Sequence, residues 1–277
     1  MAPIRSSSFV NINGRPIFID VDGEGPPMIM MHGLGGSSNF FQPLVATFSK
    51  TFTVVRFDWE GLGRSKIDLS DNADRITMPK YVRDITAVME HFKFESAILV
   101  GHSLGSVLAM MFAAQFPKRV IALVAIGPGR SRAKVPAAKA FTLQMAKNAR
   151  ELGMPALADG TVAKNVAASS SDVVRAFVRE VIAGQDGEGY ARVCEAACDD
   201  THVDPEYGLI SCPTVVVSGD QDLISPPEVG EEIAQLIGSG TATVVFRVVH
   251  SGHQQVLEDT QGVVAAIKSV IRVEDQI

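Results

Sequence analysis

Short apolar runs that end in glycine-rich turns alternate with stretches of helical periodicity along most of this chain. Near the N-terminus, Asn13-Gly14 lies between two apolar segments, which is the signal of a β-hairpin. Beyond it, helical segments separate the apolar runs. This pattern predicts an α/β fold with a mostly parallel sheet and helices on both faces. Strands after the hairpin are expected at residues 27–31, 52–57, 97–100, 120–126, 213–217 and 243–249.

The pattern changes between residues 130 and 209, where no convincing strand is found. The stretch is rich in Ala, Lys, Arg and Glu, and its periodicity predicts three or four helices inserted between strands. We expect residues 1–129 and 210–277 to form the core and residues 130–209 to form a helical cap over the active face. A peripheral helical decoration is the alternative. Breaks between the helices are expected at 153–155, 159–160, 169–171 and 184–189.

Gly101-His102-Ser103-Leu104-Gly105 lies between an expected buried strand and a helix that is apolar almost all round. Gly-x-Ser-x-Gly at such a junction is typical of a nucleophile elbow, a turn so tight that glycines flank the serine. The elbow would expose the Ser103 hydroxyl above the end of the sheet. The alternative is a glycine-rich turn with a capping serine.

A serine hydroxyl needs a base to take its proton and an acid to orient that base. His253 follows the last expected strand, and the preceding Gly252 permits a sharp turn toward Ser103. His250 is the rival base, although we assign it to the end of the strand. His102 lies beside the nucleophile in sequence, and we expect it to shape the pocket.

The orienting acid is sought after the strand at 213–217, where Asp220 and Asp222 compete. An aspartate in a Gly-Asp turn is often only a turn former, and that description suits Asp220 better. Residues 127–130, after the preceding strand, contain no acid. The order Ser, Asp, His along the chain is the order found in α/β hydrolases.

Acyl chemistry also needs hydrogen-bond donors for the oxyanion. The backbone N–H of Leu104 directly follows the proposed nucleophile. The second donor is expected from the turn at residues 32–34, and we assign it to the backbone N–H of Leu34.

Taken together, these residues resemble the α/β-hydrolase family, and the resemblance covers nearly the whole chain. It implies an eight-stranded, mostly parallel sheet with an inserted helical cap, and no cofactor. The family's Gly-x-x-Asp pattern assigns the acid to Asp222. The motifs that fall in the family's order are His32-Gly33, Phe57-Asp58-x-x-Gly61-x-Gly63-x-Ser65, Gly101-x-Ser103-x-Gly105, Gly219-x-x-Asp222 and Gly252-His253.

Two segments of the expected cap, 151–159 and 188–196, resemble those of 3-oxoadipate enol-lactonases, which open an enol-lactone ring. Those enzymes usually carry an Arg-Trp-Phe-like stretch after the first segment, whereas residues 163–167 here read Ala-Lys-Asn-Val-Ala. We therefore expect the residues that line the substrate to differ. The substrate contacts expected here are Gly33, Trp59, His102 and Met154.

Composition argues against several other functions. The formal net charge is −6 and no dense Lys/Arg run is present, so no nucleic-acid partner is expected. No apolar run could span a bilayer and no secretory signal is found, so we expect a cytoplasmic protein without a membrane partner. A homo-oligomer is compatible with the sequence. Cys194, Cys198 and His202 share a helical face, but core packing explains them better than a metal site, and no metal is expected.

Arg130, Arg132 and Lys134 cluster where the expected cap leaves the sheet. A net-acidic enzyme with an anionic substrate needs a local positive patch, which these residues would supply. An ordinary solvated charge run is the alternative.

The sequence therefore predicts a cofactor-free serine hydrolase of a small-molecule lactone or ester. Ser103 attacks the carbonyl to form an acyl-enzyme, His253 takes the proton, and Asp222 holds the imidazole. A carboxylesterase, a larger-lactone hydrolase, a C–C hydrolase and a perhydrolase are alternatives that use the same three residues. A non-catalytic ligand receptor on this fold is an alternative of a different class.

Overall fold

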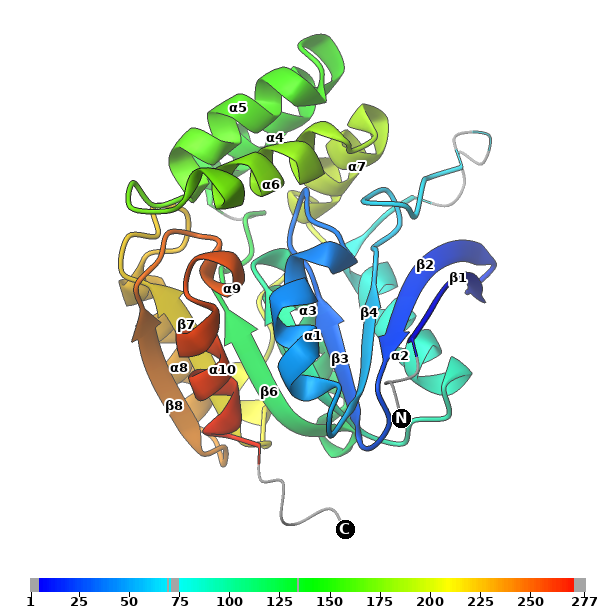
Figure 1. Ribbon diagram of the computed structural model, residues 1–277, viewed down its shortest axis with the longest axis vertical. Coiled ribbons are helices and arrows are strands. Elements are labelled where there is room, and N and C mark those ends of the chain that lie inside the picture. The colour runs from blue at the N-terminus through cyan, green and yellow to red at the C-terminus, as the bar shows by residue number, and fades with distance from the viewer. Residues whose placement is uncertain (1–4, 69, 71–74, 134, 272–277) are drawn as a thin grey trace.

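Eight strands form a single sheet in the computed structural model, which describes residues 5–68, 70, 75–133 and 135–271. The strands are β1 (Arg5–Ile12), β2 (Arg15–Asp22), β3 (Pro27–Met31), β4 (Thr53–Phe57), β5 (Ala97–His102), β6 (Val120–Ile126), β7 (Thr214–Gly219) and β8 (Val244–Val249). Their order is β1-β2-β4-β3-β5-β6-β7-β8 (Figure 1). Only the pairs β1/β2 and β2/β4 of this sheet are antiparallel, which confirms the predicted mostly parallel, eight-stranded α/β-hydrolase sheet.

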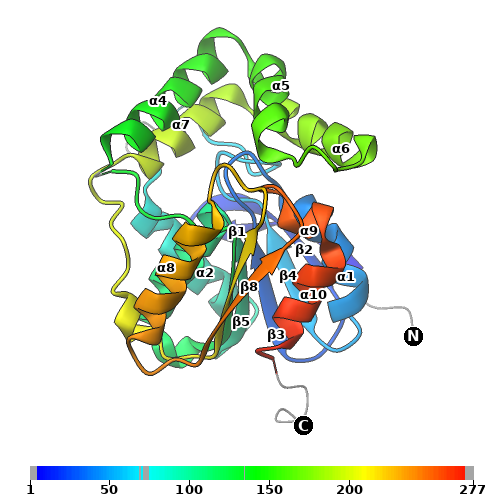
Figure 2. The same cartoon turned by 90° about the vertical axis from the view of Figure 1, so that its left-hand side faces the viewer.

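Helices cover both faces of the sheet, as Figure 2 shows. On one face, α2 (Met78–His91), α3 (Leu104–Gln115) and α8 (Pro227–Gly238) contribute to one apolar core. On the other face, α1 (Gln42–Phe48) and α10 (Thr260–Lys268) contribute to a second core. The central strands β5 and β6 are buried along almost their whole length, so their functional groups become accessible at the strand ends.

Local sequence explains where several of these elements begin and turn. The hairpin of β1 and β2 turns at Asn13 and Gly14, whose φ angles of 51° and 86° are those of a type I′ turn. At the start of α2, the Thr77 hydroxyl accepts a hydrogen bond from the Lys80 N–H and caps the helix. In α3, every residue from Leu104 to Ala114 is buried, as expected of a helix that is apolar all round.

Four helices follow β6, and no strand lies between them in the described part of residues 130–209. They are α4 (Pro136–Glu151), α5 (Met154–Asn165), α6 (Asp172–Ala183) and α7 (Gly187–Ala197). We call these four helices the helical block. The block lies beyond the carboxyl ends of the parallel strands (Figures 1 and 2). That it forms a cap domain distinct from the core stays a prediction.

One of the expected breaks in the helical block is wrong. The breaks at 153–155, 169–171 and 184–189 fall at helix ends, but Asp159-Gly160 lies inside α5. A glycine costs a helix only about 1 kcal/mol relative to alanine. The packing of α5 against α6 outweighs that local preference.

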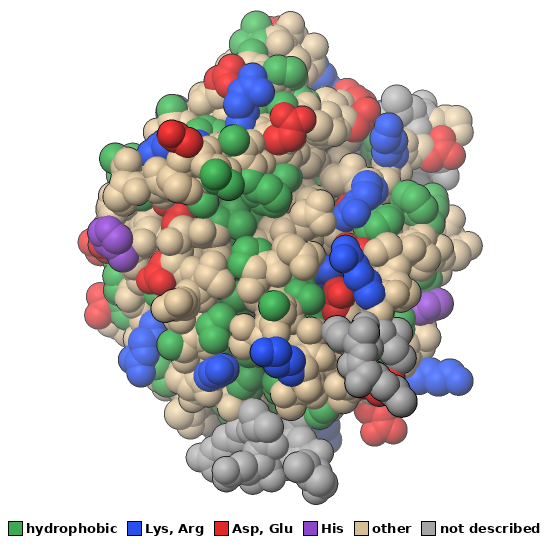
Figure 3. Space-filling view, in the orientation of Figure 1, with side chains coloured by type: hydrophobic (Ala, Val, Ile, Leu, Met, Phe, Trp, Pro, Cys, Tyr) green, Lys and Arg blue, Asp and Glu red, His purple; other side chains and the backbone are tan. Residues whose placement is uncertain are grey.

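The surface and the helices bear on the expected partners. Figure 3 shows one face of the molecule, where Lys and Arg side chains and Asp and Glu side chains are both scattered among tan and green areas. Among the described residues, no helix is both long and apolar enough to cross a bilayer.

Candidate active site

Ser103 occupies the turn between β5 and α3, at the carboxyl end of a central strand. Its φ of 51° and ψ of −117° form a conformation that non-glycine residues rarely adopt. Neighbouring glycines make the turn possible, because a Cβ at Gly101 would overlap the Gly105 carbonyl and a Cβ at Gly105 would overlap the Met31 carbonyl. This is the geometry of a nucleophile elbow, which holds the serine hydroxyl above the sheet.

His253 and Asp222 approach Ser103 from loops that are distant in sequence. His253 follows β8, and its Nε2 lies 3.0 Å from Ser103 Oγ. Its Nδ1 lies 2.7 Å from Oδ2 of Asp222, which belongs to the turn after β7. Both side chains are buried, so little water competes for these hydrogen bonds. The structure thus brings together the three residues that the sequence proposes as nucleophile, base and acid.

The Asp222 carboxylate accepts four hydrogen bonds. Oδ2 accepts from His253 and, at 3.0 Å, from Gln255 Nε2. Oδ1 accepts from the backbone N–H groups of Ile224 at 2.8 Å and Ser225 at 2.9 Å. Burial raises the pKa of the Asp222 carboxyl, but His253 and these hydrogen bonds outweigh burial, so the pKa lies below its usual value. The ionised carboxylate requires that His253 carry its proton on Nδ1.

Gln255 is a residue of the site that the sequence interpretation missed. It begins the short helix α9 (Gln255–Glu258), two residues after His253, and its side chain is fully buried. Its amide is the only side-chain donor to Asp222 besides His253 among the described residues. No motif marks this glutamine, and its closeness to His253 in sequence is the single signal that points to it.

The rival acid and base pair with each other at the surface. Asp220 Oδ2 lies 2.7 Å from His250 Nδ1, and both side chains are exposed. The hydrogen bond with Asp220 raises the pKa of the His250 imidazole. This pair therefore repeats the acid–imidazole contact of Asp222 and His253, but it does so in solvent.

Two backbone N–H groups are candidates for binding the oxyanion. Leu104 begins α3, and the amides of a first helical turn have no acceptor within the helix. Leu34 belongs to the loop after β3 and lines the same cavity as Ser103. A Cβ at Gly33 would lie 2.8 Å from the Ser103 Cβ, so this loop packs directly against the elbow. The assignment of Leu34 and Leu104 as the two donors stays a prediction.

His102 supports the backbone of His253. Its Nε2 donates a hydrogen bond to the His253 carbonyl oxygen at 2.7 Å, and its ring stacks on Phe40 at 4.2 Å between centroids. Burial and the nearby His253 lower the pKa of His102 to about 3. His102 is therefore a neutral donor at physiological pH, which fixes its tautomer.

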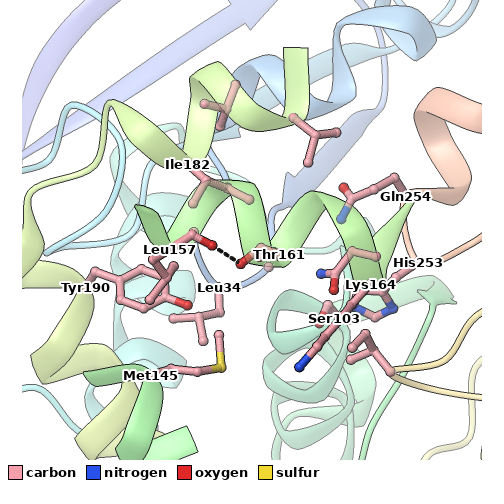
Figure 4. Close-up of a pocket in the computed structure, with 18 of the residues that line it drawn as sticks. Leu34, Ser103, Met145, Leu157, Thr161, Lys164, Ile182, Tyr190, His253 and Gln254 are labelled. Atoms are coloured by element: carbon pink, nitrogen blue, oxygen red, sulfur yellow. Dashed lines mark hydrogen bonds between the residues drawn. The ribbon is translucent and has the colours of Figure 1, made fainter. Parts of the chain in front are cut away.

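Ser103 and His253 open onto a cavity of about 240 Å³ at the junction of the strand ends and the helical block (Figure 4). Gly33 and His102, two of the four expected substrate contacts, line this cavity. The charged side chains that line it are Arg132 and Lys164. Most other walls are apolar and include Leu34, Phe141, Met145, Leu157, Ile182 and Tyr190.

The other two expected contacts, Trp59 and Met154, are not among the described residues that line the cavity, which corrects the prediction. Trp59 is 1% exposed and packs between the rings of Phe57 and Tyr81, while its Nε1 donates to the His32 carbonyl at 3.0 Å. Met154 begins α5 with its side chain buried in the apolar core. Neither side chain is free to contact a substrate, because both are buried in the apolar core.

The basic cluster of the sequence is divided in the structure. Arg130 forms surface ion pairs with Asp204 and Glu232 at 2.8 and 2.6 Å. Arg132 lines the cavity and is partly buried. Lys134 lies outside the described residues.

The Cys194, Cys198 and His202 group behaves as part of the core. Burial raises the pKa of the Cys194 thiol to about 12, so this sulfur is a thiol and not a thiolate. His202 Nδ1 donates to the Ala197 carbonyl at 2.7 Å. In the part of the chain that the structure describes, no group of three or more His, Cys, Asp or Glu could hold a metal ion.

Comparison with known proteins agrees with this architecture. A family model of the alpha/beta hydrolase fold matches residues 26–260. The pyrrolizixenacetamide deacetylase of Xenorhabdus hominickii is 25% identical, over 96% of this chain and 98% of that protein. The 3-oxoadipate enol-lactonase 2 of Acinetobacter baylyi is 24% identical over 89% of each chain. The crystal structure of the enol-lactonase from Burkholderia xenovorans superposes with a TM-score of 0.83 at 26% identity, over 95% of this chain and 98% of that one.

The matched family model spans most of the chain, and the fold places its strands, elbow and helices in the order that the motifs predict. The resemblance to enol-lactonases that the cap segments suggest is also confirmed by these relatives. The chain therefore belongs to the α/β-hydrolase fold family and is a hydrolase.

Proposed function

We propose that this hydrolase opens a small lactone, or cleaves a small ester, through an acyl-enzyme on Ser103. The observation that supports it best is the pair of contacts of His253, 3.0 Å from Ser103 and 2.7 Å from Asp222. Both distances lie within the range of about 2.6–3.2 Å over which a positioned base can take a proton.

The proposed reaction begins when His253 Nε2 takes the proton of Ser103 as the oxygen attacks the carbonyl. The backbone N–H groups of Leu34 and Leu104 stabilise the oxyanion. The ring C–O bond then breaks, and His253 gives its proton to the leaving oxygen. In an enol-lactone that oxygen leaves as an enol, which becomes a ketone. A water deprotonated by His253 finally releases the acid from Ser103.

The charge of the cavity favours a substrate that carries a carboxylate. Arg132 and Lys164 line the cavity, whereas no described Asp or Glu does, although the chain as a whole has a net charge of −6. Two cations in a mostly apolar site attract and orient an anionic group. A carboxylate-bearing lactone is thus the first substrate class to test, in keeping with the enol-lactonases among the relatives.

A serine-reactive fluorophosphonate followed by peptide mapping tests the nucleophile. We expect labelling at Ser103, and we expect Ser103→Ala to lower kcat by at least about 10³-fold. Ser218→Ala is the matched control, because Ser218 is a buried serine on β7 whose hydroxyl has no described partner. Turnover by folded Ser103→Ala at close to the wild-type rate would refute serine catalysis.

The substrate class is tested with a panel of lactones and aryl esters, each as the free acid and as its methyl ester. We expect Arg132→Gln to raise KM about tenfold or more for the acids, because it removes the charge-assisted hydrogen bond proposed between the Arg132 guanidinium and the substrate carboxylate. The same variant should leave KM for the methyl esters within about twofold. Equal effects on both series would contradict carboxylate recognition by Arg132.

A carboxylesterase is the runner-up, because the mostly apolar wall of the cavity also suits an uncharged acyl chain. Activity on acyclic aryl esters without activity on any lactone of the panel would favour this function. Binding of a lactone with no turnover over a long incubation would instead favour a ligand receptor on this fold.

A further inference from the structure

Both backbone groups of His253 are held by other parts of the fold. Its N–H donates a hydrogen bond of 2.7 Å to the carbonyl of Asn165, the last residue of α5 in the helical block. Its carbonyl accepts the 2.7 Å hydrogen bond from His102 Nε2 in the elbow. The backbone from which the imidazole projects is therefore fixed on one side by the elbow and on the other side by the helical block.

Glu258 joins the same two parts of the fold a few residues further on. Its Oε2 accepts a hydrogen bond of 2.8 Å from the Ala167 N–H and another from the Ser170 hydroxyl, both in the connection after α5. Its Oε1 accepts a hydrogen bond of 3.0 Å from the Gln254 N–H, next to His253. A single carboxylate thus ties residues 165–170, which we call the latch segment, to the histidine loop.

The latch segment and the histidine loop are in close backbone contact. A Cβ at Gly252 would lie 2.7 Å from both the Ala167 nitrogen and the Asn165 oxygen, so a larger residue there would push the two apart. Lys164, which precedes the latch segment, lines the same cavity as His253 and Gln254, and all three are labelled in Figure 4. A shift of the latch segment would therefore move the backbone that carries the imidazole of His253.

We infer that Glu258 is a positioning residue that couples the helical block to the base of the reaction. By fixing the latch segment it keeps the Asn165 carbonyl in place, and that carbonyl in turn orients the backbone of His253. This inference rests on the proposed function, because it needs His253 to act on Ser103. It gives the helical block a second role besides lining the cavity, which is to set the distance from His253 Nε2 to Ser103 Oγ.

Two substitutions of Glu258 remove its hydrogen bonds to the latch segment and the histidine loop to different extents. In Glu258→Gln the amide keeps one oxygen as an acceptor, and its NH₂ group replaces the other oxygen. That NH₂ group faces N–H or O–H donors, so the hydrogen bonds on one side of the carboxylate are lost. In Glu258→Ala both sides break. Misplacement of a catalytic group by about 1 Å can cost about 10²-fold in rate. We expect kcat to fall about tenfold in Glu258→Gln and up to about 10²-fold in Glu258→Ala, while KM stays within about twofold.

The decisive measurement is the rate at which diisopropyl fluorophosphate labels Ser103, compared with kcat on an aryl ester. This probe is small, and its reaction needs the base but few cavity contacts. If Glu258 positions His253, labelling and kcat fall by the same factor in each variant. If Glu258 only shapes the cavity, KM rises and labelling keeps its wild-type rate, which would overturn the inference.

Arg150→Gln is the matched control. It breaks the ion pairs of Arg150 with Glu188 at 2.7 Å and Glu195 at 2.5 Å, which join α4 to α7 away from the latch segment. We expect it to lower the melting temperature without slowing the labelling of Ser103. If Arg150→Gln slows the labelling of Ser103 as much as Glu258→Gln does, the effect would come from a general destabilisation of the helical block. This result would also overturn the inference.

Two further results keep this test separate from that of the proposed function. If wild-type protein is not labelled at Ser103, the proposed function fails and the inference fails with it. If wild-type protein is labelled and Glu258→Gln is labelled equally fast, the inference alone fails. Should Glu258→Ala not fold, Ser170→Ala removes one donor of the bridge, and its labelling rate is expected to lie between those of wild type and Glu258→Gln.

Discussion

Replacing Asp222 by Asn isolates the role of the acid, because it keeps the shape of the side chain and removes its charge. The hydrogen bonds of the turn decide which way the new amide points. Oδ1 accepts two backbone N–H groups, from Ile224 and Ser225, so an NH₂ at that position would face two donors. The amide nitrogen must therefore occupy the position of Oδ2, opposite His253.

This orientation inverts the tautomer of the imidazole. Facing an N–H donor at 2.7 Å, His253 Nδ1 must become an acceptor, and its proton moves to Nε2. Nε2 then presents an N–H to Ser103 Oγ, 3.0 Å away, and cannot take the serine proton. Gln255 does not oppose the change, because its amide can turn and accept through Oε1, which has no partner among the described residues.

The expected loss in kcat is about 10⁴-fold, the size of the effect when a triad is held in the wrong tautomer. At about 1.36 kcal/mol per factor of ten, this corresponds to a barrier higher by roughly 5 kcal/mol. KM should change by less than about threefold, because Asp222 is not among the described residues that line the cavity.

The assay is steady-state hydrolysis of an aryl acetate, with circular dichroism to show that the variant is folded. Asp220→Asn is the matched control, since Asp220 makes a hydrogen bond of the same length, 2.7 Å, to His250 in the same turn region but at the surface. We expect that control to keep kcat within about twofold. A folded Asp222→Asn enzyme that retains more than about a tenth of wild-type kcat would refute the tautomer argument.

Three other predictions follow from the buried parts of the fold. Burial lowers the pKa of His102 to about 3 and also lowers the pKa of His32. Below about pH 6.5 the unfolded chain therefore takes up these protons before the folded chain does, and for His102 this difference persists down to about pH 3. Stability is then fully present above about pH 6.5, and His102 alone lowers it by about 1.4 kcal/mol for each pH unit below that value, with a further loss in the same direction from His32, which urea titrations at several pH values will measure. Gly105→Ala should cost at least about 3 kcal/mol by thermal unfolding, because its Cβ overlaps the Met31 carbonyl, and an unchanged melting temperature would contradict the packing of the elbow. Trp59→Phe should cost about 1–3 kcal/mol, because a buried carbonyl loses its donor, yet leave kcat within about threefold, whereas a large rise in KM would return Trp59 to the substrate site.

The sequence predicts the sheet well because each strand is marked twice, by an apolar run and by the turn after it. The same turns carry the chemistry. Ser103, Asp222 and His253 each follow a strand, and parallel strands deliver their carboxyl ends to one edge of the sheet, so their meeting is a consequence of topology. The meeting of these three residues, which are distant in sequence, is predictable only because the order and direction of the strands determine it.

Side chains that depend on how helices pack are not predictable in this way. Trp59 and Met154 are expected from the sequence to contact the substrate, but both side chains pack into the apolar core. Lys164 reaches the cavity from α5, although nothing in its local sequence distinguishes it from a solvated lysine. Gln255, at the start of α9, contacts Asp222 across 33 residues of sequence, and no hydrophobic periodicity predicts such a contact.

Residues of the elbow and residues of the cavity wall tolerate amino-acid substitution to different extents. The elbow admits no substitution of its glycines, since backbone carbonyls fill the space of a Cβ, so the reacting centre is fixed by the core. Most cavity walls contributed by the helical block are apolar side chains, and a change in their size would admit a different substrate to the same three residues. The exception is the connection after α5, because the Asn165 carbonyl holds the backbone of His253. A change in the block that alters specificity must therefore preserve the position of residues 165–170, or it will slow every substrate alike.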